Sequence, residues 1–159
     1  MNTQPNRAMR RHSSKSPGSD RNKANPPMLV TRTLANTEME IRERQCINAF
    51  THGVAKEQHF DLLLLMMNLL LIAGQTSPER KYALDYAEQK IKPVIVSIRG
   101  RFGNTGKLGV NALELKALRD MVDFSREFWL RQPGELWVYA DKEVCAYYDE
   151  LAAKRRAAA

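Results

Sequence analysis

The most apolar stretch of the chain runs from Phe60 to Ala73 and reads FDLLLLMMNLLLIA. A membrane-spanning helix needs about 20 apolar residues, and this run is shorter. A buried strand usually has about 4 to 8 residues and is rich in β-branched types. Here Leu and Met, which favour helix, dominate, and Ile72 is the single β-branched residue. The run therefore predicts a buried helix over about 56–73, ended by Gly74.

A helix that is apolar nearly all round must be covered on most sides by other elements. Glu57, Asp61, Asn68 and Gln75 fall close to one stripe at helical spacing, which predicts that this stripe faces water. Asn68 leaves two interpretations open. It is either a buried polar group that fixes register or binds something, or the partly exposed edge of the helix, which we favour.

Four further helices are predicted from apolar residues that recur every three or four positions. Thr37 with Glu40, and Asn111 with Glu114, form capping boxes before the first and the fourth helix of the chain. Pro93 lies inside the third helix and predicts a kink or a break. The expected ranges are 38–52, 79–99, 111–131 and 135–153, and the glycine-rich segment 100–109 is expected to be an unstructured, mobile connection.

The predicted fold class is all-α, a compact bundle of about five helices around the central apolar helix. The chain has 159 residues, of which 43% are hydrophobic, enough for one domain with a sizeable core. We expect a disordered basic tail over 1–33, one helical domain over 34–153 and a short basic, Ala-rich tail over 154–159. Neither a signal peptide nor a membrane span is predicted, so we expect a cytoplasmic protein.

Metal and thiol chemistry find little support in the sequence. Cys46 and Cys145 both lie beside apolar residues in helical patterns, which predicts two reduced, buried thiols. The three histidines have no ligand-like spacing with either cysteine. Asp120, Asp123 and Glu127 share one helix face, which we interpret as a solvated acidic face rather than a metal edge. We predict no metal site, no cofactor and no catalytic residue.

A short glycine-rich motif, Gly103 to Lys107, reads GNTGK and resembles part of a phosphate-binding loop. That loop needs a glycine five positions before Gly106, a Ser or Thr after the lysine, and a strand before it. Arg101 and Leu108 occupy the two positions, and a helix is predicted upstream. We therefore predict that the protein is not a nucleotide hydrolase and not an enzyme.

The net charge of +7 is unevenly distributed. Residues 1–32 carry +6 and residues 154–156 carry +3, which leaves −2 for residues 33–153. Between Glu88 and Glu114 there are five basic residues and no acidic one. Basic ends and a basic connection on a mildly acidic body favour contact with a polyanion, nucleic acid first.

The candidate nucleic-acid-binding residues follow from this charge pattern. Arginine can pair with phosphate through two hydrogen bonds, and Phe102 can stack on a base. Alternatively, Phe102 only ends an apolar stripe and the arginines are only solvated. The candidates are Arg7, Arg10, Arg11, Lys15, Arg21 and Lys23 in the tail, and Lys90, Lys92, Arg99, Arg101, Phe102 and Lys107 around the connection.

Two functions of different classes remain. The first is a non-enzymatic helical accessory protein that binds DNA or RNA, largely through phosphate contacts of the basic arm and the Gly/Arg connection. The alternative is a helical protein–protein interaction module, such as a regulator, adaptor or inhibitor of a larger complex, with a homodimer as one form of it. The alternative rests on surplus apolar surface, with Trp129 and Trp137 as candidate interface residues.

Overall fold

The computed structural model describes residues 28–158, with side chains from Thr37 onward. The expected disordered tail, with its six candidate basic residues, lies outside the described residues apart from its last few positions. Within 28–158 the chain is helical, with short connections and no strand, which confirms the all-α class. The elements are α1 (Met28–Thr51), α2 (Glu57–Gln75), η1 (Pro78–Arg80), α3 (Lys81–Tyr86), η2 (Ala87–Ile91), α4 (Lys92–Thr105), α5 (Ala112–Leu130) and α6 (Gly134–Ala157).

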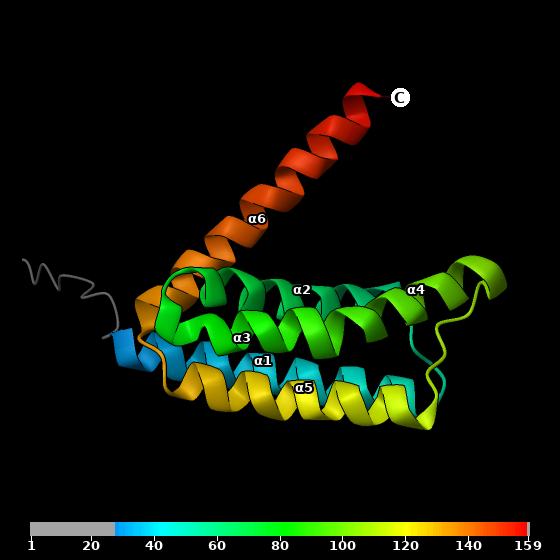
Figure 1. The fold of residues 1–159 in the computed structure, drawn as a ribbon, viewed down its shortest axis with the longest axis horizontal. Coiled ribbons are helices and arrows are strands. Elements are labelled where there is room, and N and C mark those ends of the chain that lie inside the picture. Colours follow the sequence, from blue (N-terminus) through cyan, green and yellow to red (C-terminus); the bar gives the residue numbers. More distant parts are fainter. Residues whose placement is uncertain (1–27, 159) are drawn as a thin grey trace, which may run out of the picture.

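The predicted central helix is the centre of the core. Eight residues of α2 are buried, among them Leu63 and Leu70, which are fully enclosed. Figure 1 shows α1 and α5 side by side in one layer, and α2 with the α3–α4 segment in a second layer. The helix α6 starts against α2 and then leaves the body at a steep angle, so that the C-terminus lies at a free end (Figure 1).

The first helix begins earlier than predicted. α1 starts at Met28, ten residues before the expected start at Glu38. The predicted capping box of Thr37 and Glu40 is wrong, because both residues lie inside the helix. Glu40 instead pairs with Arg44 one turn later, at 2.5 Å. The segment before residue 38 contains no proline or glycine after Pro27, so nothing in it stops the helix.

Helical periodicity predicts that Glu43 lies with Glu40 and Arg44 on the exposed face of the first helix, and this prediction is wrong for Glu43. Its side chain is only 5% exposed, because α5 packs against α1 and covers this position. Burial, reinforced by the negative charge of Glu40, raises the pKa of Glu43 to about 7, while Arg126 on α5 opposes the shift. A buried carboxyl on the second face means that α1 is covered on two sides.

The proline in the third helix is accommodated by a wider helical turn. The five residues before Lys92 form a π-helix, and the Lys92 N–H donates to the Ala87 carbonyl five residues back. Pro93 follows at once and starts α4 without interrupting the helical path. Since a π-turn inserts one residue, it shifts the hydrogen-bond register just where the missing proline N–H would break an α-helix. The result is one long segmented helix from Pro78 to Thr105.

Of three helix-end signals, Gly53 acts as the sequence predicts and the other two do not. Gly53 has a left-handed φ of 69° and follows the end of α1, as predicted. Gly74 does not end α2; it is buried in the last turn of α2, where it lies against α3. The expected C-terminal tail from Lys154 onward continues α6 to Ala157. Alanines favour helix, and cations in the last turn complement the helix dipole.

Candidate functional site

The predicted mobile connection over 100–109 is largely helical. α4 continues through Gly100 and Gly103 to Thr105, and Gly106 ends it in the left-handed conformation with a φ of 67°. Only the residues from Gly106 to Asn111 connect α4 to α5. The prediction of an unstructured segment is therefore wrong for residues 100–105. The two glycines inside α4 did not stop the helix because a glycine costs a helix only about 1 kcal/mol.

Arg101, one of the predicted phosphate-binding residues, is held in a network inside this connection. Its guanidinium Nη2 donates to Oε1 of Glu114 at 2.7 Å, and Nη1 donates to the Gly109 carbonyl. The same Oε1 accepts from the Ser97 hydroxyl at 2.8 Å. Oε2 of Glu114 accepts from the Asn111 N–H at 2.8 Å, which completes the predicted capping box. Arg101 thus fixes the α4–α5 connection and is occupied in doing so.

The electrostatics of Glu114 agree with this structural role. Burial alone would raise its pKa, but hydrogen bonds from Arg101, from the backbone of Asn111 and from Ser97 outweigh it. The pKa of Glu114 is consequently lowered to about 2. The carboxylate is charged at neutral pH and binds Arg101 tightly.

The other candidates around the connection differ in availability. Lys92 pairs with Glu88 one turn earlier, at 2.8 Å. Lys90, Arg99 and Lys107 are exposed, and none of them forms an ion pair with another residue of the described chain. Phe102 is half-buried and packs against the core, which supports its interpretation as the end of an apolar stripe.

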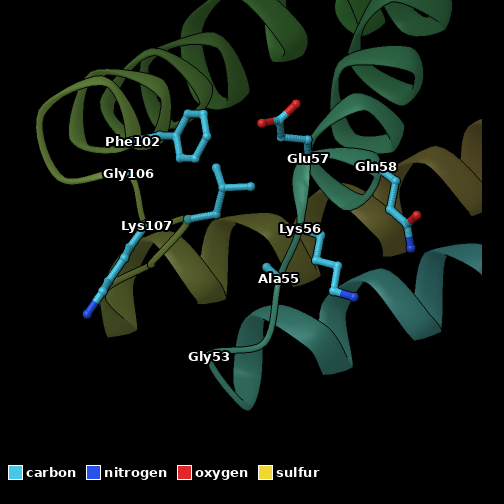
Figure 2. A pocket seen from close by; sticks show the side chains of 9 residues that line it. Gly53, Ala55, Lys56, Glu57, Gln58, Phe102, Gly106 and Lys107 are labelled. Atoms are coloured by element: carbon cyan, nitrogen blue, oxygen red, sulfur yellow. The ribbon is translucent and has the colours of Figure 1, made fainter.

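A hollow of about 540 Å³ lies beside this connection, between the α1–α2 loop, the first turn of α2 and the end of α4. Figure 2 shows Lys56 and Lys107 at its rim, with their amino groups pointing away from one another. The Gly106 N–H donates to the Phe102 carbonyl at 2.7 Å, and the Lys107 N–H donates to the Thr105 hydroxyl at 3.2 Å. With these amides engaged and the lysines diverging, the GNTGK motif forms no phosphate cradle.

A much larger groove, of about 1430 Å³, lies between α2 and the projecting α6; we call it the α2–α6 groove. It adjoins the smaller hollow, since Glu57, Gln58, Phe102 and Leu108 line both. Its floor is formed by α2 side chains that the core leaves half-buried, namely Leu62, Leu64, Leu65, Leu71 and Ile72. Its opposite wall is formed by α6 residues, namely Tyr139, Val144, Tyr147, Tyr148 and Leu151.

One hydrogen bond joins the floor of the groove to the wall. The amide Nδ2 of Asn68 on α2 donates to the hydroxyl of Tyr148 on α6 at 3.0 Å. Asn68 is half-buried, as expected for the edge of the helix. Beyond this contact α6 diverges from the body (Figure 1). The groove lies between the diverging helix and α2.

The charged residues along the groove are of both signs. Glu57, Asp61 and Glu143 are acidic, and Arg99 and Arg155 are basic. None of these five side chains forms an ion pair with another residue of the described chain. Charges that rim an apolar groove without partners of their own are suited to recognise a partner that is apolar on one face and charged at its ends.

The predicted interface tryptophans lie at one end of the bundle. Trp129 is only 7% exposed and packs edge-on against Phe128 and Trp137, with ring centroids 4.9 and 4.8 Å apart. Trp137 is half-buried beside it. Trp129 therefore belongs to the core of a single chain, and neither tryptophan lines the α2–α6 groove.

Sequence reasoning missed the α6 wall of the groove. The last predicted helix has an apolar stripe at helical spacing, and its first members, Leu136, Ala140 and Val144, are buried. The same stripe continues to Tyr148, which still contacts Asn68 of α2, and to Leu151, and both residues line the groove where α6 diverges from the body. Periodicity identifies the stripe and contains no signal for the angle at which the helix leaves.

The acidic face on α5 and the two thiols lie in the part of the chain that the structure describes. No cluster of three His, Cys, Asp or Glu side chains among the described residues could hold a metal ion. Asp120 pairs with Lys116 at 2.7 Å, and Glu127 with Arg131 at 3.7 Å. Burial, with a smaller contribution from Glu43, raises the pKa of Cys46 to about 12, so its thiol is a poor nucleophile.

Two further observations bear on the expectations of buried thiols and of no membrane span. Cys46 is buried as predicted, but Cys145 is exposed on α6, so the prediction of two buried thiols is wrong for the second. By length and composition alone, α2 could cross a membrane. The central helix of a helical core passes the same test, and α2 has eight buried residues.

Comparisons of the chain with protein-family models, with curated proteins and with solved structures found no match.

Proposed function

We propose that this protein is a non-enzymatic protein–protein interaction module whose α2–α6 groove binds an amphipathic helix of a protein partner. The observation that supports it most is the groove itself, with five half-buried aliphatic side chains of α2 on one side and an aromatic wall on the other. Surfaces of this kind bind helices through apolar residues spaced three or four apart.

The size of the groove suits a helix better than a small molecule. Pockets for small ligands are typically about 300–1,000 Å³. The α2–α6 groove, at about 1430 Å³, exceeds this range and lies along two helices. An elongated occupant such as a helix about 10 Å across therefore suits it better.

The α2 helix explains why such a surface can persist. A run of leucines long enough to fill a core on one side leaves leucines on the other sides as well, and the helices α1, α3 and α6 do not cover all of them. Contiguous apolar surface that stays open in a folded chain usually serves an interaction. The half-exposed positions on α2 follow because its apolar side chains lie on more sides of the helix than the other helices cover.

A second function, nucleic-acid binding, is supported by a different observation. Lys90, Arg99 and Lys107 are exposed and have no ion-pair partner among residues 37–158, and the last turn of α6 adds Lys154 to Arg156. These cations would contact phosphates, together with the basic residues of the tail. We rank this function second because Arg101 and Lys92 are already paired and the glycine-rich amides are engaged.

The first function is tested with two probes of the groove. The dye 1-anilinonaphthalene-8-sulfonate reports open apolar surface, and a phage-displayed library of 16-residue peptides reports helix binding. We expect dye binding and selected peptides with apolar residues at i, i+3 or i+4, and i+7. Both signals should fall in Leu151→Glu, which places a charge on the groove wall, and persist in Ala153→Glu.

Ala153 is a matched control because it is exposed on the same helix, two residues away and about 200° around the axis from Leu151. Circular dichroism establishes that both variants keep the helical content of the parent. The proposal is wrong if neither probe binds the parent chain at concentrations where the groove is unoccupied, or if both variants bind equally well.

The second function is tested by fluorescence titration with single-stranded DNA, double-stranded DNA and RNA at two salt concentrations. Phosphate contacts predict an affinity that falls with salt and drops in the triple variant Lys90→Ala/Arg99→Ala/Lys107→Ala. No detectable binding at low salt would exclude this function.

A further inference from the structure

We infer that the groove is occupied by α6 of a second copy of this chain, so that two copies form a twofold dimer in which each inserts the second half of its α6 into the groove of the other. This inference rests on the proposed function, since it names the partner of the same groove. It is supported by the direction of α6, by the position of its apolar stripe and by the unpaired charges on the floor of the groove and at the end of α6.

Because of the direction in which α6 runs, the other helices do not cover its second half. α6 has 24 residues, and its first half packs on α2 through Leu136, Ala140 and Val144. The second half projects from the body and ends free (Figure 1). An isolated helix of about 12 residues is marginal in water, so such a projection is expected to gain its stability from packing.

The apolar stripe continues along the projecting half. Beyond the buried Val144, Tyr148 and Leu151 extend the stripe at spacings of four and three, and the basic Arg155 follows four residues later; all four residues line the groove. This is the spacing at which one helix packs along another. Tyr147 and Tyr148 are 54% and 38% exposed, which is high for aromatic residues that face a groove.

A second copy covers both unpaired surfaces at once. The floor of the groove belongs to α2, and the wall belongs to α6 of the same chain. When α6 of one copy enters the groove of the other, the two projecting helices pack against each other and each covers the partner's floor. A twofold interface has this property, because the same patch of each copy both inserts its helix and receives the helix of the other copy.

The charges complement one another in the same arrangement. The last turn of α6 carries Arg155 and Arg156, which have no ion-pair partner in the described chain, whereas Lys154 pairs with Glu150 at 2.8 Å. The floor of the groove carries Glu57 and Asp61, also without ion pairs there. Insertion brings a basic helix end toward an acidic floor, which fixes the orientation of the inserted helix.

The area involved is that of a stable interface. A projecting segment of about 12 residues, roughly 18 Å long and about 10 Å across, has a side surface of roughly 570 Å². Two such segments, each covered by a helix and a floor, bury on the order of 1,500 Å² in total, which is the range of specific interfaces. The basic segment 1–27 is a poorer occupant, because its large apolar residues are only Met1 and Met9.

The test measures the mass of the full-length chain by light scattering and by sedimentation over a range of concentrations. We expect a monomer–dimer equilibrium, with the Kd raised about thirtyfold or more by Leu151→Glu, the size of a hot-spot loss, and unchanged within about twofold by Ala153→Glu. Asp61→Lys should weaken the dimer about tenfold, and adding Arg155→Glu and Arg156→Glu to it should restore most of that loss.

Each other result overturns the inference. A dimer that Leu151→Glu does not weaken uses another face. If the chain stays monomeric at several hundred micromolar while the dye and the peptides bind its groove, the proposed function stands and the inference of a second copy as partner is wrong. If the chain is monomeric and binds neither probe, both the proposed function and this inference are wrong.

Discussion

The guanidinium of Arg101 and the carboxylate of Glu114 meet at 2.7 Å and tie the end of α4 to the start of α5. Sequence reasoning took Arg101 for a phosphate ligand, because it stands in a basic, glycine-rich stretch. The structure gives it a protein carboxylate instead, thirteen residues further along the chain. A basic residue next to glycines is thus a candidate for nucleic-acid binding only when it does not already form an ion pair with a carboxylate of the same chain.

This pair makes a prediction for acid stability. The pKa of Glu114 is lowered to about 2 in the folded chain, against an ordinary value of 4.5. Its contribution to stability is therefore present above pH 4.5 and is lost as the pH falls from 4.5 toward 2. Arg101→Leu should raise the pKa of Glu114, lower the thermal midpoint at pH 7 and move the acid-unfolding midpoint to higher pH, as followed by circular dichroism.

Arg99→Leu is the control for this prediction. Arg99 lies two residues earlier on α4, is exposed, and forms no ion pair with residues of the described chain. It should leave the acid-unfolding midpoint where it is. Equal shifts in the two variants would mean that the ion pair with Glu114 has no special role.

Glu43 predicts a pH dependence of the opposite sign. Its pKa is raised from 4.5 to about 7, so the folded chain binds a proton more tightly than the unfolded chain between these values. Stability should fall as the pH rises through this window, by about 3 kcal/mol if the whole shift is expressed. Glu43→Gln should remove this slope and stabilise the chain at pH 8 by roughly 1–3 kcal/mol.

Urea unfolding of the parent chain and of Glu43→Gln at pH 5 and pH 8 measures how the free energy of unfolding depends on pH. The exposed Glu38 on the same helix is the matched position, and Glu38→Gln should leave the difference between the two pH values unchanged. A slope that survives Glu43→Gln would show that Glu43 is not its source.

Gly74 and Gly100 predict opposite results for the same substitution. A Cβ on Gly74 would lie 2.4 Å from the backbone nitrogen of Leu84, so Gly74→Ala forces α2 and α3 apart. We expect a loss of about 1–3 kcal/mol in the free energy of unfolding, as for an overpacked core. Gly100 lies inside α4 with nothing within 4 Å of an added Cβ, and Gly100→Ala should stabilise by about 0.5–1 kcal/mol.

Chemical denaturation of the two alanine variants against the parent measures both effects. The pair is informative because helix propensity alone predicts a gain at both positions. If Gly74→Ala also stabilised the chain, the close approach of α2 to α3 would be contradicted.

The two cysteines should react at very different rates. Cys145 is exposed, whereas Cys46 is 1% exposed and its thiol donates to the His59 carbonyl at 3.2 Å. With a pKa of about 12, only about one Cys46 thiol in ten thousand is ionised at pH 8. An aromatic disulfide reagent should modify one thiol per folded chain quickly and the second only after unfolding.

Cys145→Ser should abolish the fast phase of this reaction, and Cys46→Ser should leave it intact. Two fast thiols in the folded parent would show that Cys46 is accessible. One fast thiol also makes Cys145 a convenient single labelling site on α6 for the association experiments described above.

Local signals were sufficient for the helices themselves. The Phe60–Ala73 run identified the central helix, the pattern of α5 identified its start at Asn111 and Glu114, and Pro78 began the next helix after Ser77. These features depend on residues within four positions of each other, and helical periodicity records such neighbours directly. The error at the start of α1 arose because nothing between Pro27 and Glu38 stops the helix, and the error at the end of α4 arose because glycine is only a weak helix breaker.

Local sequence patterns therefore predict the helical class, the central helix and its surplus of apolar residues. They do not predict that Glu43 is buried, that Arg101 meets Glu114, that Gly74 lies against Leu84 or that α6 diverges from α2 beside a groove. Each of these features depends on which helices meet and at what angle. Such contacts join residues far apart in the chain, and no local pattern encodes them.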